Sequence, residues 1–82
     1  MELKAEVLAE DVQTREDVEY VTLSCRELGD KPLLQMLDYG LRREEMSQKG
    51  KLLNKTVLLH IQTIRAIFAG RPQCQGHLTL VK

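Results

Sequence analysis

The sequence predicts an all-β protein of 82 residues, with five strands and one short helical segment between the third and fourth strands. Apolar and polar residues alternate in several segments, and a period of two residues is typical of a half-buried strand. The long apolar segment at residues 55–68 is also rich in Val, Ile and Thr, whose branched side chains favour strands over helices.

The first two strands follow from this alternation. In residues 1–9 every odd position is apolar, and Glu2, Lys4 and Glu6 are charged. The polar residues 13–17 predict a turn. Residues 18–25 then form the second strand, in which one alternate set faces the core, namely Val21, Leu23 and Cys25.

The third segment fits two patterns. Its leucines fall at helical spacing, yet Leu33, Leu37 and Tyr39 also share one face of a strand. Gly40 costs about 1 kcal/mol relative to alanine inside a helix, which favours the strand. We therefore predict a turn at residues 29–32, a strand over residues 32–39 and a charged helical segment over residues 41–48.

The fourth and fifth strands form a predicted hairpin. Val57, Leu59 and Ile61 alternate, and the pattern resumes at Ile64 after a slip of one residue. A slip of this kind is produced by a β-bulge. The hairpin loop is predicted at residues 70–76, between the bulged strand and a final strand at residues 77–81.

A second interpretation gives an α+β fold. Residues 33–48 and 55–69 then form two helices, packed on a small antiparallel sheet. A near-neutral domain of this class suits a protein–protein interaction module or regulator with no nucleic-acid role.

Composition and charge limit the possible classes of function. Hydrophobic residues make up 43% of the chain, which indicates a globular domain rather than a disordered one. The 12 basic and 12 acidic residues give a net charge of zero, which argues against a generic cationic DNA-binding protein. We find no apolar run near the roughly 20 residues that span a bilayer, and no signal peptide. We expect a cytoplasmic protein with reduced cysteines.

The predicted order of five strands and one helix resembles the OB-fold, a small five-stranded Greek-key barrel. The segment GKLLNKTVLLHIQTI followed by GRPQCQGHLTL looks like the last two strands of such a barrel. In length and strand order the chain is similar to the single-stranded DNA-binding proteins of filamentous phages, the gene V type. This resemblance implies a homodimer that binds single-stranded DNA or RNA without sequence specificity, by aromatic stacking and phosphate neutralisation.

Six residues are candidates for nucleic-acid binding. Arg65, Phe68 and Arg71 lie close together on the predicted hairpin, where a ring could stack on bases and guanidinium groups could pair with phosphates. The sheet would contribute Tyr20, Arg26 and Tyr39. The alternatives are a core position for Phe68, solvated arginines, and tyrosines that cover the barrel end or a dimer contact.

Enzymatic and metal sites are not expected. We find no nucleophile motif and no glycine-rich phosphate loop. Cys74 and His77 have the spacing of half a zinc site, but Cys25 and His60 lack the paired spacing of a second half. We therefore expect a binding protein without a metal or other cofactor.

Overall fold

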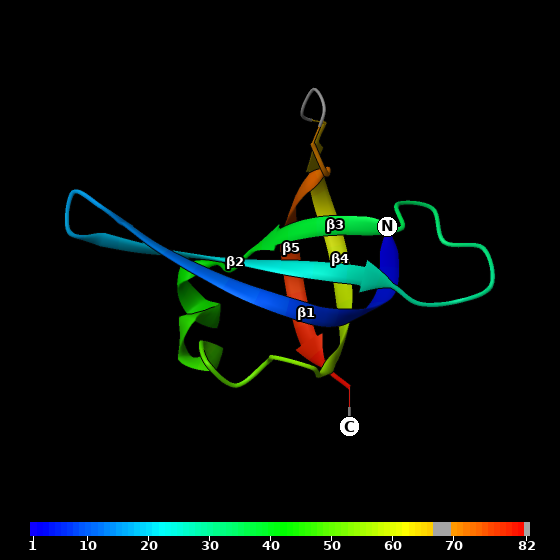
Figure 1. Cartoon of the computed structure of the whole chain (residues 1–82), viewed down its shortest axis with the longest axis horizontal. Helices are drawn as coiled ribbons and strands as arrows, with labels where there is room; N and C mark the ends of the chain where they lie inside the picture. The colour runs from blue at the N-terminus through cyan, green and yellow to red at the C-terminus, as the bar shows by residue number, and fades with distance from the viewer. Residues whose placement is uncertain (67–69, 82) are drawn as a thin grey trace.

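The residues that the structure describes form five strands and one short helix. The computed structural model describes residues 1–66 and 70–81 (Figure 1). In chain order the elements are β1 (Glu2–Arg15), β2 (Val18–Glu27), β3 (Met36–Gly40), the 3₁₀ helix η1 (Arg43–Gln48), β4 (Thr56–Arg65) and β5 (Gln73–Leu80). Within these described ranges, no helix is long and apolar enough to cross a membrane.

The strands form a closed barrel in the order β1-β2-β3-β5-β4, with β4 pairing back onto β1. Every neighbouring pair is antiparallel except β3 and β5, which run parallel. The predicted all-β class, a small OB-like Greek-key barrel with a helix between strands 3 and 4, is thus confirmed. The α+β alternative is wrong, because β3 lies within its first proposed helix and β4 occupies most of its second.

The first hairpin is longer than predicted. β1 continues to Arg15 instead of ending near Ala9, because a register shift between Val7 and Ala9 changes which side chains face inward. The predicted five-residue turn shrinks to Glu16 and Asp17, whose φ angles of 52° and 64° are both positive, as in a type I′ turn. The resulting hairpin extends beyond the barrel (Figure 1).

The third strand is shorter than predicted, since β3 begins at Met36 rather than at Pro32. Proline has no N–H to donate to a ladder, and Gln35 has a left-handed φ of 61° that ends the extended backbone.

The fourth strand contains the predicted bulge, where the register shifts between Ile61 and Thr63. Gly76 lies opposite this bulge, and a Cβ atom there would come within 1.9 Å of the His60 carbonyl oxygen. The close approach keeps β5 paired through Gly76, so this strand begins at Gln73 and not at His77. The predicted loop at residues 70–76 is correspondingly shorter.

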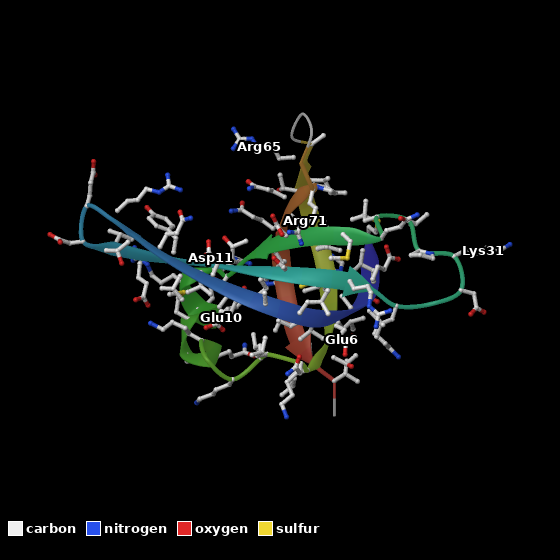
Figure 2. The ribbon with its side chains drawn as sticks, viewed as in Figure 1. Glu6, Glu10, Asp11, Lys31, Arg65 and Arg71 are labelled. Atoms are coloured by element: carbon white, nitrogen blue, oxygen red, sulfur yellow. The ribbon has the colours of Figure 1, made fainter. Side chains whose placement is uncertain are left out.

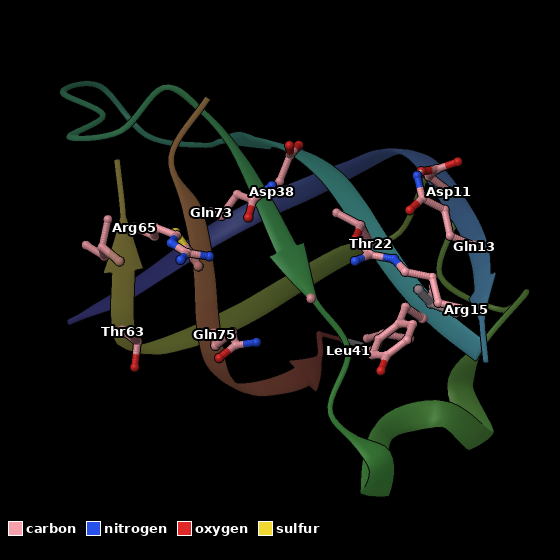
Figure 3. A pocket seen from close by; sticks show the side chains of 15 residues that line it. Asp11, Gln13, Arg15, Thr22, Asp38, Leu41, Thr63, Arg65, Gln73 and Gln75 are labelled. Atoms are coloured by element: carbon pink, nitrogen blue, oxygen red, sulfur yellow. The ribbon is translucent and has the colours of Figure 1, made fainter. Parts of the chain in front are cut away.

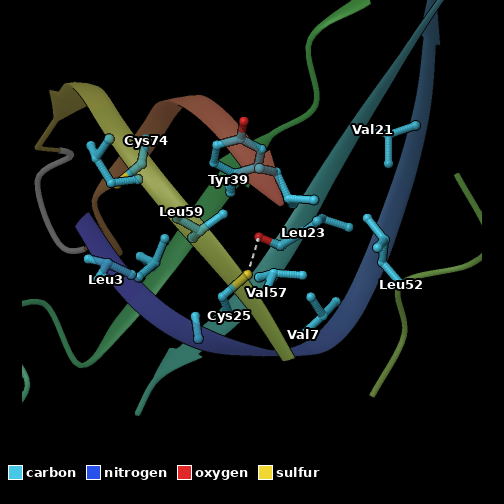
Figure 4. Packing of buried hydrophobic residues seen from close by; sticks show 14 residues of the cluster. Leu3, Val7, Val21, Leu23, Cys25, Tyr39, Leu52, Val57, Leu59 and Cys74 are labelled. Atoms are coloured by element: carbon cyan, nitrogen blue, oxygen red, sulfur yellow. Dashed lines mark hydrogen bonds between the residues drawn. The ribbon is translucent and has the colours of Figure 1, made fainter. Parts of the chain in front are cut away.

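The barrel interior is filled by one set of alternate side chains from each strand (Figure 4). Val21, Leu23 and Cys25 face inward as predicted, and all three are buried. The buried apolar residues also include Leu3, Ala5, Val7, Leu37, Tyr39, Leu52, Val57, Leu59, Ile61, Cys74 and Leu78.

A buried carboxylate closes one end of this core. Glu45, on η1, accepts hydrogen bonds from the Tyr39 hydroxyl at 2.9 Å, the Arg42 N–H at 3.0 Å and the Leu78 N–H at 2.7 Å. It therefore links β3, η1 and β5, and all three of these partners are donors. A carboxylate offers only acceptors, so it matches this environment.

We predict that Glu45→Gln lowers the free energy of unfolding by about 2–3 kcal/mol. The substituted amide has one acceptor oxygen and points N–H groups at donors, which leaves buried groups unsatisfied. Urea unfolding measures the loss. The control is Glu44→Gln, because Glu44 makes only a surface pair with Arg42 and should change stability by less than about 1 kcal/mol. Equal stability of the two variants would contradict a structural role for Glu45.

The two buried cysteine thiols should make the folded state less stable at alkaline pH. Burial raises the pKa of Cys25 to about 12, with smaller contributions from Asp38 and Cys74. Burial followed by Asp38 likewise raises the pKa of Cys74. In the unfolded chain a thiol ionises near pH ~8.5, so the unfolded state loses protons first and is favoured as the pH rises toward 12.

We therefore predict that the free energy of unfolding falls between pH 8 and pH 10, by up to about 1.4 kcal/mol per pH unit for each such thiol. Cys25→Ala should be less stable at pH 8 but should lose less on going to pH 10. Urea titrations of both proteins at the two pH values give the comparison. An identical alkaline decrement in the variant would rule out Cys25 as its source.

Candidate functional site

A groove of about 710 Å³ crosses the outer side of the barrel and draws on all five strands (Figure 3). Asp11, Gln13 and Arg15, on β1, form one wall of the groove. Thr63 and Arg65, on β4, lie at its opposite wall. The other lining residues are Tyr20, Val21, Thr22, Asp38, Gly40, Leu41, Ile64, Gln73, Cys74 and Gln75.

Strand register explains why these polar residues meet. Gln13 is opposite Tyr20, and Asp11 is opposite Thr22. Thr22 on β2 is in turn opposite Gly40 on β3. Asp38 on β3 is opposite Gln73 on β5, and Gln73 is opposite Arg65 on β4. Directly opposed residues share one face of a sheet. The outward side chains of five strands therefore form one continuous polar surface.

Tyr20 supplies an exposed aromatic ring on this surface. The residue is 52% exposed, and the guanidinium carbon of Arg15 lies 5.5 Å from the centroid of its ring. This cation–π contact is worth about 0.5–1 kcal/mol at an exposed site and holds the two side chains together. Together they present a flat apolar ring beside a positive charge.

The positive charges at the other end come from Arg65 and Arg71. Arg65 lines the groove directly, and Arg71 lies 3.9 Å from Asp38 through its Nη1 and the Asp38 Oδ1. In Figure 2 Arg65 lies toward the end of the β4–β5 hairpin, and Arg71 lies lower in the same view. Because Asp11 and Asp38 also line the groove, its two aspartates offset the charges of Arg15 and Arg65.

Two sequence-predicted residues lie away from the groove, and a third, Arg71, lies beside Asp38 without lining it. Tyr39 is fully buried, and its hydroxyl donates to Glu45, so the expectation that its ring stacks on a base is wrong. It has the same parity as Leu37 on β3 and therefore faces the core. Arg26 is exposed on the far end of β2, where it pairs with Glu6 at 2.7 Å instead of lining the groove.

Phe68 lies outside the described residues. The structure thus brings together Tyr20 and Arg65, with Arg71 beside Asp38 at the groove. The sequence interpretation missed Arg15 and the glutamines of the groove, namely Gln13, Gln73 and Gln75. A two-residue turn at Glu16–Asp17 would have placed Arg15 near Tyr20, but the polar run was assigned to the turn itself.

A metal site is not built from the cysteine and histidine residues. Cys74 is buried and His77 is exposed, because residues three apart on a strand face opposite sides. His77 lies opposite His60 on β4, and one of its ring nitrogens is 2.9 Å from the Arg42 guanidinium. Within residues 1–66 and 70–81, no group of three His, Cys, Asp or Glu side chains could hold a metal ion.

The groove is thus a shallow surface, with an exposed ring, two lining arginines and several neutral hydrogen-bonding side chains. Comparison of the chain with protein-family models, curated proteins and solved structures gave no match.

Proposed function

We propose that this protein binds single-stranded DNA or RNA in the groove, with little sequence specificity and without catalysing a reaction. The observation that carries the proposal is the exposed Tyr20 ring, flanked by Arg15, on a continuous surface that ends at Arg65. Single strands expose base faces as well as phosphates, and a surface that offers both a ring and guanidinium groups suits them.

Stacking is expected to contribute more than phosphate neutralisation. One base stacked on an aromatic ring is worth about 1–3 kcal/mol. Among the described residues, Arg15, Arg65 and Arg71 are the arginines at the groove that would contact phosphates, and Asp38 partly offsets Arg71. Each neutralised phosphate of a single strand contributes about 0.7 to the salt slope, so three contacts give a slope of about −2.

We predict that a fluorescent 20-nucleotide single strand binds the protein and that Arg65→Ala weakens binding and reduces the salt slope by about 0.7. Fluorescence anisotropy at several salt concentrations measures both quantities. Arg26→Ala is the matched control, because Arg26 is an exposed arginine outside the groove and should leave affinity and slope unchanged. No binding by the wild type at low salt would end the proposal and redirect attention to a protein partner.

We also propose that the protein is a homodimer joined along β1. β4 pairs with β1 only over Glu2–Glu6, and Val7 is bonded to Asn54 and Lys55. Beyond Leu8, within the described part of the chain, no strand covers the outer edge of β1. An uncovered edge presents N–H and C=O groups in the spacing that another strand can pair with.

The direction of the backbone groups follows from the β2 ladder. The Val21 carbonyl bonds to Leu41, on the side of β3, so the even residues of β2 bond toward β1. Their partners on β1 are Asp11, Gln13 and Arg15. The backbone N–H and C=O groups of the alternate residues Glu10, Val12 and Thr14 are therefore directed to the open edge.

A second copy of the same strand complements this edge in charge. Asp11 and Arg15 each lie two residues from Gln13. If two copies pair antiparallel about Gln13, Asp11 of one copy opposes Arg15 of the other, and opposite charges directly across two strands are stabilising. The same pairing would place two grooves on one extended sheet.

We predict that Val12→Pro converts the dimer to a monomer, since proline removes an N–H from the open edge without touching the β1–β2 ladder. Sedimentation velocity at several concentrations gives the mass, and circular dichroism checks that the barrel remains folded. Val12→Thr keeps the N–H and a branched side chain and should remain dimeric. A monomeric wild type, or a dimeric Val12→Pro variant, would refute pairing through this edge.

A further inference from the structure

The two histidines of the chain lie side by side on the outer face of the barrel, next to the groove. His60 on β4 is directly opposite His77 on β5, both are exposed, and their ring centroids are 6.5 Å apart. Gln75 lines the groove, and His77 follows it on the same face of β5, about 7 Å further along the strand. The histidine pair therefore continues the surface of the groove.

On the side of β1, His60 is faced by one carboxylate and two amines. Glu2 is opposite His60, with 3.6 Å between its Oε2 and the His60 Nδ1. Lys4 lies two residues further along β1, on the same face as Glu2. The Met1 amine donates to the Ile61 carbonyl oxygen at 3.1 Å.

On the side of η1, the neighbour of the pair is Arg42. Its Nη1 lies 2.9 Å from the His77 Nδ1, and its Nη2 lies 3.0 Å from the Glu44 Oε2. A guanidinium has no acceptor, so this contact requires an unprotonated ring nitrogen on His77. Protonation would make that nitrogen a donor as well. The contact would then be lost, and both side chains would need an acceptor from elsewhere.

Acidification therefore changes the charge of this surface. With both imidazoles neutral, the charges of Lys4 and Arg42 offset those of Glu2 and Glu44. Histidine is the side chain that gains its charge between pH 8 and pH 5, whereas carboxylates stay mostly ionised at pH 5.5. Protonation of both imidazoles would leave these six side chains with two positive charges in excess, beside a groove whose own charges nearly balance.

The chemistry of the protonated pair matches a phosphate group. A phosphate has only acceptor oxygens, and imidazolium and guanidinium groups have only donors. We propose, on the basis of the proposed single-strand binding, that His60 and His77 extend the groove by a phosphate-binding site that operates only when both imidazoles are protonated. Single-strand binding then strengthens as the pH falls from 8 to 5.5. At pH 8 the groove alone holds the strand.

The test is the salt dependence of the binding of fluorescent (dT)20 at pH 8 and at pH 5.5, measured by anisotropy. Thymine has no group that titrates in this range, so a change in slope comes from the protein. Each new phosphate contact adds about 0.7 to the slope, so two imidazolium ions should steepen it by about 1.4, and release of Arg42 would bring the change to about 2. Affinity at 0.1 M salt should rise by about tenfold. Circular dichroism at both pH values checks that the barrel remains folded.

Two variants assign the effect to this pair. His60→Gln/His77→Gln removes both histidines of the chain and keeps polar side chains, so it should bind as the wild type does at pH 8 and show no steepening at pH 5.5. The Met1 amine is present in both proteins, so its titration cancels in the comparison. Leu33→His, added to this double variant, restores one imidazole on an exposed loop outside the groove and should not restore the steepening.

Three outcomes would overturn the histidine site and leave single-strand binding standing. These are equal slopes at the two pH values in the wild type, steepening that persists in the double variant, and steepening restored by Leu33→His. Absence of binding at both pH values would overturn both proposals.

Discussion

The closure of the barrel depends on a short parallel seam between β3 and β5. Among the described residues, the pairs there are Asp38 with Gln73 and Tyr39 with Cys74, together with a 2.9 Å bond from the Asp38 N–H to the Pro72 carbonyl. Parallel pairing is slightly less stable per residue than antiparallel pairing. Glu45 reinforces the seam, because its carboxylate bonds to Tyr39 on β3 and to Leu78 on β5. The outer side of the same seam is the centre of the groove, where Asp38 and Gln73 meet.

Alternate residues of β3 at this seam contribute to the core on one face and to the groove on the other. Tyr39 faces inward and completes the core, while its neighbours Asp38 and Gly40 face outward and line the groove. Tyr20 has the opposite position on β2, beside the buried Val21. The two tyrosines therefore have different roles: one is a hydrogen-bond donor inside the barrel, and the other is an exposed ring. A shift of one residue in either strand would turn the tyrosine of that strand to the opposite face.

Much of the fold could be predicted from the sequence because alternation is a local property. The five strands, the facing of Val21, Leu23 and Cys25, and the bulge after Ile61 are all visible as patterns of apolar residues. The site was predicted less completely, since it depends on which strand lies beside which. The bulge near Leu8 reverses the facing of β1, and no apolar residue pattern marked Gln13 or Arg15 as neighbours of Tyr20.

The ends of strands were also difficult to predict because backbone conformation decided them. Glu16 follows the end of β1, and Gln35 precedes the start of β3. Both adopt positive φ, which is uncommon for residues other than glycine, and they set strand boundaries that side-chain patterns alone would place elsewhere. Tyr39 was a different case, because the sequence pattern already placed it on the same strand face as Leu37, and the structure shows that this face is the core. Its burial beside Glu45 depends on η1 folding back across the barrel end, which is a tertiary contact.

Charge balance in the groove has a consequence for how tightly one copy can bind. Arg15 and Arg65 line the groove together with Asp11 and Asp38, so a single groove would attract a polyanion weakly and would depend on stacking at Tyr20. Two weak sites joined on one sheet can bind far more tightly than either alone, because the second contact becomes intramolecular. The proposed pairing of two β1 edges would produce this arrangement with the same residues that line the groove. In this arrangement affinity would come from joining two sites.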